Sequence, residues 1–237
     1  DLVDRHRQDA AYERALTLAW TQAQIQLRHL SISHEEAHLF QTLAGYVMHA
    51  SSALRPGSTS VSGGLGPQSM LWPHGISGDR PIVLVRIDDI EHIELVHEVL
   101  RAFEYWKAKQ LPVDVVILNE RMASYTQDLQ LAIEALVRKS VSPKPHDPTA
   151  AAGDVFTLRA DLASPDSLRV LPSLARIVLV SRRGSLANQL ARISEMGVAV
   201  TLPERRQANL DTGRAASADA LPPLDFYNGW GGFTADG

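Results

Sequence analysis

The sequence contains no cysteine among its 237 residues. This absence excludes disulfide bonds, catalytic thiolates and Cys-based zinc sites. The chain also lacks an excess of charge of one sign, because 23 Lys and Arg stand against 27 Asp and Glu, for a formal net charge of −4. Such a balance gives no basic footprint for nucleic acid or for an anionic membrane surface, so we expect no nucleic-acid partner.

Long hydrophobic runs are lacking as well. The longest apolar run falls far short of the roughly 20 residues that a membrane helix needs, so we expect no direct membrane insertion by this segment. No signal-peptide pattern is present at the start. Because the chain begins with Asp1 rather than Met and closes with "GWGGFTADG", we expect a segment of a longer protein. Apolar residues still make up 45% of the chain, which is enough for a sizeable core.

The first 50 residues have the pattern of two helices. Residues 9–30 carry apolar side chains near helical spacing. The second helix is expected to begin after Ser33, which together with Glu36 forms a capping box. Its expected apolar face consists of Ala37, Phe40, Leu43, Ala44 and Val47. We therefore predict a helical linker pair over residues 1–50, followed by a Gly/Ser/Pro-rich loop over residues 51–70.

The region after this loop alternates between strand and helix patterns. Expected strands are 81–87, 113–119 and 154–160, and expected helices are 91–110, 124–139 and one that opens at Ser164-Pro165. Strands that alternate with helices form right-handed βαβ units and a parallel sheet. The predicted fold class is therefore α/β, with an N-terminal helical hairpin followed by a small Rossmann-like parallel sheet of three to five strands with flanking helices. We assign this module to residues 71–203.

The segment 166–203 fits two interpretations. "ARIVLVS" has the pattern of a fourth strand, which would be followed by a helix at 185–196 and a strand at "VAVTL". Pro172 argues against one unbroken helix but suits a helix that starts there. Leu174, Ile177, Val178 and Ser181 keep helical spacing, and this favours the helix.

The turn "HGISGD" and the Trp before it form the first candidate contact site. Its residues are Trp72, His74, Gly75, Ser77, Gly78 and Asp79. A glycine-rich loop that cradles phosphate follows a strand and precedes a helix, whereas this turn precedes a strand. We interpret it mainly as a tight turn that needs a positive φ at Gly75 or Gly78 and is closed by Asp79. The rings of Trp20, Trp72, Trp106, Trp230 and the tyrosines are suited to stacking on sugars, but for Trp106 and Phe103 we prefer a position in the core.

Polar residues at the ends of two expected strands form the second candidate contact site. Asp88 and Asp89 follow the first strand, while Asn119 and Glu120 close the second. Open α/β sheets bind ligands at the carboxyl ends of their strands, and carboxylates there can hold a metal or sugar hydroxyls. Asp and Asn are also favoured as helix N-caps, and this is the interpretation that we prefer.

The sequence "HEEAH" matches the zincin pattern, with His34 and His38 one helical turn apart and Glu35 between them. A zinc protease also needs a third ligand and a dry cleft, neither of which the sequence indicates. The adjacent Glu36 is explained by the capping box. We therefore expect no metal and no other cofactor.

Several long blocks of the sequence resemble the cyclic β-1,2-glucan synthases. They are "AWTQAQIQLRHLSISHEEAHLFQTLAGYVMHASSALRP", "LWPHGISGDRPIVLVRI", "AFEYWKAKQLPVDVVILNER", "SYTQDLQ", "SRRGSLANQL" and "FYNGWGGFTADG". The resemblance implies a large polytopic membrane protein that polymerises glucose from UDP-glucose, with a cellobiose/chitobiose-phosphorylase-like part thought to control chain length. It also implies that residues 204–237 are a linker and the start of a β-sandwich domain. No catalytic residue of that family has a counterpart here.

These observations lead to one preferred hypothesis and two rivals. The preferred hypothesis is a non-catalytic connecting module of such a synthase, on the cytoplasmic side of the bacterial inner membrane. Its partners would be neighbouring domains of the same polypeptide and β-1,2-glucan. The alternative is a Rossmann-like enzyme domain that binds a nucleotide or a phosphosugar at its strand ends. The third is a metalloprotease that uses the "HEEAH" histidines.

Overall fold

A computed structural model describes most of the chain, and the predicted α/β class is confirmed. The described residues are 9–49, 52–55, 66–121, 127–140 and 153–195. Among them no helix is long and apolar enough to cross a membrane. Several predictions fall outside the described residues: most of the Gly/Ser/Pro-rich loop, the start of the helix expected from 124, the strand expected at "VAVTL", and the linker and sandwich start at 204–237.

The N-terminal helical pair has the predicted form. It consists of α2 (Asp9–His29) and α3 (His34–His49). The Ser33 hydroxyl accepts the Glu36 backbone N–H at 3.1 Å, and a Glu36 carboxylate oxygen accepts the Ser33 backbone N–H at 2.8 Å, so the capping box is complete. All five residues expected on the apolar face of the second helix are buried.

The centre of the fold is a sheet of four parallel strands in the order β3-β2-β1-β4. The strands are β1 (Ile82–Ile87), β2 (Asp114–Asn119), β3 (Val155–Arg159) and β4 (Ile177–Val180). The two inner strands are almost entirely buried, as continuous apolar runs predict for a sheet that is covered on both faces.

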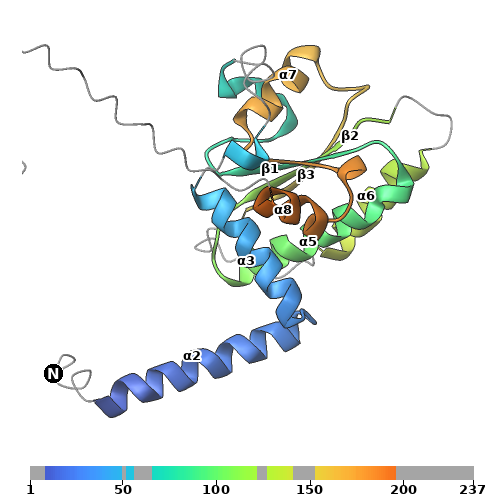
Figure 1. Ribbon diagram of the computed structural model, residues 1–237. Helices are drawn as coiled ribbons and strands as arrows, with labels where there is room; N and C mark the ends of the chain where they lie inside the picture. Colours follow the sequence, from blue (N-terminus) through green and yellow to red (C-terminus); the bar gives the residue numbers. More distant parts are fainter. Residues whose placement is uncertain (1–8, 50–51, 56–65, 122–126, 141–152, 196–237) are drawn as a thin grey trace, which may run out of the picture. The chain divides into compact units, whose positions relative to one another are not determined.

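Helices cover both faces of the sheet (Figure 1). Besides α3 they are η2 (Gln68–His74), α5 (Ile93–Ala108), α6 (Asp128–Ser140), α7 (Pro165–Leu174) and α8 (Leu186–Glu195), and the short helix η3 (Ile90–His92) leads into α5. One face packs against α3, α5, α6 and α8 through a core that contains Val83, Val85 and Ile87. The opposite face packs against η2 and α7 through Ile82 and Leu84. Alternate residues of β1 therefore serve the two layers.

The helix favoured for the segment from Pro172 onward is wrong. Pro172 lies inside α7, which ends at Leu174, and residues 177–180 form strand β4. Val83 and Ile177 are partners in the parallel pairing of β1 with β4. A four-residue apolar run fits either a helix or a strand, and its place beside β1 decides for the strand. The alternative interpretation, with a fourth strand and a helix after it, is confirmed as far as the structure describes the segment.

Candidate functional site

The strand order creates a switch point between β1 and β4. From β1 the chain moves outward through α5 to β2 and through α6 to β3, and both helices lie on one face of the sheet. It then returns through α7, on the opposite face, to β4 on the other side of β1. In open α/β sheets, ligands bind outside the carboxyl ends of the strands at such a point.

At the switch point, the residues that follow β1 and β4 neutralise each other. Arg182 forms an ion pair with the carboxylate of Asp88, and the Ser181 hydroxyl lies 3.4 Å from Oδ1 of the same carboxylate. The Asp88 side chain is only 19% exposed. Its charge is therefore largely covered and already compensated, which leaves little capacity to bind a cation or a sugar hydroxyl.

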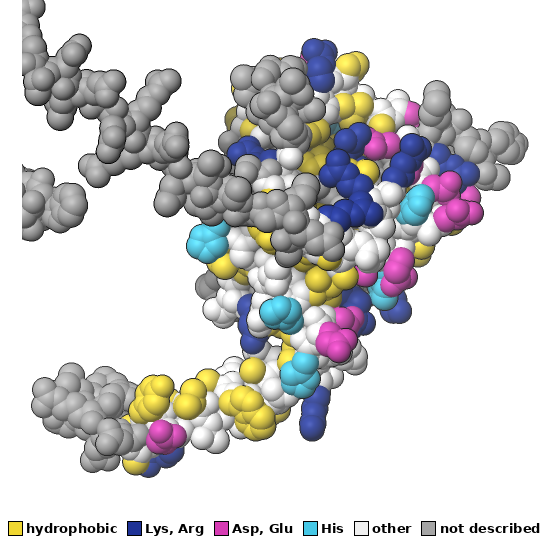
Figure 2. Space-filling model, viewed as in Figure 1, with side chains coloured by type: hydrophobic (Ala, Val, Ile, Leu, Met, Phe, Trp, Pro, Cys, Tyr) yellow, Lys and Arg dark blue, Asp and Glu magenta, His cyan; other side chains and the backbone are white. Residues whose placement is uncertain are grey.

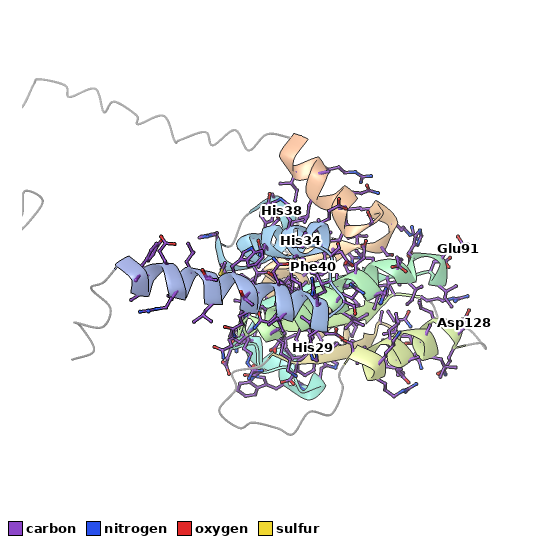
Figure 3. All side chains as sticks on the ribbon, turned by 90° about the horizontal axis from the view of Figure 1, so that it is seen from below. His29, His34, His38, Phe40, Glu91 and Asp128 are labelled. Atoms are coloured by element: carbon purple, nitrogen blue, oxygen red, sulfur yellow. The ribbon has the colours of Figure 1, made fainter. Side chains whose placement is uncertain are left out.

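Asp89 caps the short helix that leads into α5. Its Oδ1 accepts the backbone N–H of Glu91 at 3.1 Å, so the interpretation of Asp89 as a cap is confirmed. The connection "DDIEH" contains no glycine and three carboxylates. Figure 3 shows Glu91 and Asp128 on the side of the domain where α5 and α6 begin. Negative side chains at these helix starts disfavour a phosphate ligand.

The residues that end β2 are also partnered within the protein. The Asn119 side chain donates to Gln130 Oε1 at 3.1 Å and accepts the backbone N–H of Arg121 at 3.0 Å. Glu120 binds the Arg86 guanidinium through contacts of 2.8 and 2.9 Å. Asn119 is buried, and its amide holds the backbone at Arg121 rather than facing solvent.

The N-terminal end of α8, where an anion could bind, is occupied by a carboxylate of the protein itself. The backbone N–H of Leu186, at the start of α8, donates to Glu98 Oε2 at 2.7 Å. Burial raises the pKa of the Glu98 carboxyl, the hydrogen bond from Leu186 lowers it, and the charge of Glu94 raises it again. Because this carboxylate already accepts the N–H, the start of α8 is closed to a phosphate group.

The turn before β1 is closed by its own side chains. Gly75 and Gly78 have φ values of 76° and 80°, which confirms the interpretation as a tight turn. Asp79 accepts a hydrogen bond from the Ser77 hydroxyl and one from Gln68 Nε2 at 3.3 Å. Trp72, in η2, is 64% exposed. The turn is therefore held in one conformation by its own hydrogen bonds, and the helix before it exposes an indole ring to solvent.

The two candidate contact sites lie at opposite ends of the strands. The first is at the amino ends, and the second is at the carboxyl ends, which we call the carboxyl edge of the sheet. The residues from Trp72 to Asp79 precede β1, whereas Asp88 and Asp89 follow it. At about 3.3 Å per residue, the six residues of β1 separate them by roughly 20 Å. Asp88, Asn119 and Glu120 share the carboxyl edge, but each pairs with a different neighbour. The ten candidate residues therefore do not form one site.

The "HEEAH" histidines lie on the surface of α3 (Figure 3). His34 Nε2 lies 3.1 Å from Oε1 of Gln24 on α2. Within the described ranges, no group of three or more His, Asp or Glu side chains is arranged to hold a metal ion. The two histidines thus have no third ligand in that part of the chain.

Sequence reasoning missed the residues that close the carboxyl edge. The helical interpretation of the segment includes Ser181, and neither interpretation predicts that Ser181 and Arg182 lie beside Asp88. The available signal was that both "IVLVSRR" and "IVLVRIDD" begin with four apolar residues of strand type and end in charged residues. Glu98 gave no such signal, because its contact with Leu186 joins residues that are 88 positions apart.

The strand order and the closed carboxyl edge define a Rossmann-like α/β module without an open phosphate cradle among its described residues. No known protein-family model matches the chain. The chain is similar to the cyclic beta-(1,2)-glucan synthase NdvB of Rhizobium meliloti (strain 1021), with 36% identity over 251 aligned residues. The alignment covers 99% of this chain but only 8% of that synthase. The match confirms the resemblance drawn from the sequence and is what one segment of a longer synthase would give.

Proposed function

We propose that this chain is a non-catalytic connecting module of a cyclic β-1,2-glucan synthase, in which it positions neighbouring sugar-handling domains of the same polypeptide. The whole polypeptide would transfer glucosyl units from UDP-glucose on the cytoplasmic side of a bacterial inner membrane. A phosphorylase-like part of it would control the length of the glucan.

One observation carries the proposal: Asp88, Asn119 and Glu120, at the carboxyl edge, are each paired within the protein. Asp88 pairs with Arg182, Glu120 with Arg86, and Glu98 accepts the first N–H of α8. A catalytic acid, base or nucleophile has to be within reach of a substrate. These three carboxylates instead hold strand ends and helix ends in place.

The proposal is tested in the longer synthase polypeptide with the variants Asp88→Asn and Glu120→Gln. Glucosyl transfer from UDP-glucose is expected to stay within about twofold of the unchanged enzyme once the folded fraction is taken into account. The variant Asp166→Asn, which breaks an exposed ion pair on α7, is the matched control. A loss of about 100-fold or more with an unchanged melting temperature would identify a catalytic acid or base and overturn the proposal.

A second role, contact with glucan at the turn of residues 72–79, is favoured by the exposed indole of Trp72. An indole ring on a rigid turn can stack on the apolar face of a sugar ring. Isothermal titration of the 237-residue chain with β-1,2-glucooligosaccharides is expected to show binding that Trp72→Ala removes, and cellooligosaccharides are expected to bind less. Trp20→Ala is the matched control, because Trp20 is equally exposed, at 66%, but lies on α2. Absence of heat, together with a cooperative melt, excludes the contact.

A further inference from the structure

The helix α2 carries large apolar side chains that the domain does not cover. Those at least 50% exposed are Tyr12, Leu16, Leu18, Trp20 and Ile25. Figure 2 shows hydrophobic side chains along this helix. Single exposed apolar residues are ordinary, but five on one helix are more than expected for a helix in solvent and indicate a partner.

Three of these side chains extend a face that already packs within the protein. Tyr12, Leu16 and Trp20 follow each other at intervals of four residues, and the same line continues to Leu27. Leu27 and, in the turn after the helix, Leu30 are partly buried against the large hydrophobic core. The C-terminal end of the face is thus covered by this domain, while its N-terminal part is uncovered.

The charge pattern of α2 differs from that of a helix in solvent. Residues 15–27 contain no Asp, Glu, Lys, Arg or His, and their polar members are all Thr or Gln. Leu18 and Ile25 add apolar groups on the side opposite Leu16. A helix with apolar residues on two sides and no charge through its middle has the composition of an enclosed helix.

We infer that the face of α2 formed by Tyr12, Leu16 and Trp20 docks on an apolar, uncharged protein surface elsewhere in the same longer polypeptide. This inference rests on the proposed function, in which the chain is one module of a synthase. The aligned relative is more than ten times as long as the matched segment, so a surface within the same polypeptide is available at high effective concentration. The aliphatic side chains of Leu16, Leu18 and Ile25 favour a protein partner over a sugar.

The test is photo-cross-linking in the longer polypeptide, with p-benzoylphenylalanine at position 16 and, as the matched control, at the exposed position of Gln22. Mass spectrometry is expected to find cross-links from position 16 to residues of the same polypeptide outside 9–195, at least fivefold above those from position 22. Equal yields from both positions would overturn the inference. They would not affect the connecting role, because glucosyl transfer by the carboxyl-edge variants tests that role separately.

A second copy of the chain is the rival occupant. Sedimentation of the 237-residue chain at micromolar concentration is expected to give a monomer. A dimer that Trp20→Glu dissociates, or cross-links from position 16 that join two copies, would assign the face to self-association and overturn the inference.

Discussion

Helices α2 and α3 are neighbours in sequence and carry similar numbers of large apolar residues, but those of α3 are largely buried and those of α2 are largely exposed. On α3, Phe40, Leu43 and Val47 are at most 1% exposed and belong to the main core. On α2, Leu16 and Trp20 are 54% and 66% exposed. An apolar pattern at helical spacing thus identifies the face of a helix that is suited to burial. Whether that face is buried depends on which other elements the fold places against it.

The largest expected effect comes from truncating the covered face. Phe40→Ala should destabilise the domain by about 3–5 kcal/mol, because the ring is buried and packs against Tyr105 with ring centroids 6.0 Å apart. Trp20→Ala, its counterpart on α2, should change stability by less than about 0.5 kcal/mol. Urea unfolding followed by circular dichroism measures both values. Equal losses for the two variants would remove the distinction between the helices.

An intermediate effect is expected at the point where the covered part of α2 begins. Leu27 is partly buried against the main core, so Leu27→Ala should cost about 1–2 kcal/mol, less than a fully buried leucine. The same urea titration applies, with Ile25→Ala as the control, because Ile25 is 61% exposed. If Leu27→Ala were as neutral as the control, α2 would not be anchored to the domain by this face.

The N-terminal end of α3 offers a smaller effect. Ser33→Ala removes the hydroxyl that accepts the Glu36 N–H and should cost about 1 kcal/mol. Thr17→Ala removes a hydroxyl that bonds to the Glu13 carbonyl inside α2, and it should be neutral or slightly stabilising because alanine is the better helix former. Melting temperatures of the two variants provide the measurement. A reversed order would mean that the capping box does not support α3.

These particulars also show how far the sequence predicts the fold. The apolar face of α3 and its cap were predictable because five positions at helical spacing and the Ser33–Glu36 pair agree. Strand β4 was not, because "IVLV" is too short to have a diagnostic period, and its pairing with β1 depends on a crossover from β3.

The candidate residues divide in the same way. The capping role of Asp89 was predictable, because it depends on a residue two positions away. The ion pair of Asp88 with Arg182 was not, because it depends on the strand order. Local signals therefore revealed the local roles, while the closure of the carboxyl edge follows from contacts across the sheet.

The smallest expected effect is the difference between a carboxyl group that is partly buried, Glu98, and one that is exposed, Glu13. It should appear in the pH dependence of stability. Burial raises the pKa of the Glu98 carboxyl, which lies on α5 near Glu94 and Glu36. The folded protein therefore holds this proton more tightly than the unfolded chain, and it binds more protons over the window from the ordinary value of 4.5 up to the raised pKa. The contribution of Glu98 to stability is present below this window and is lost as the pH rises through it.

The variant Glu98→Gln keeps an oxygen that can accept the Leu186 N–H and has no proton to lose in this window. Its urea midpoint should therefore fall less steeply from pH 4.5 upward than that of the unchanged chain. Glu13→Gln, on the exposed part of α2, controls for the loss of one negative charge. Parallel pH profiles for Glu98→Gln and the unchanged chain would mean that burial does not raise the proton affinity of Glu98 in the folded protein.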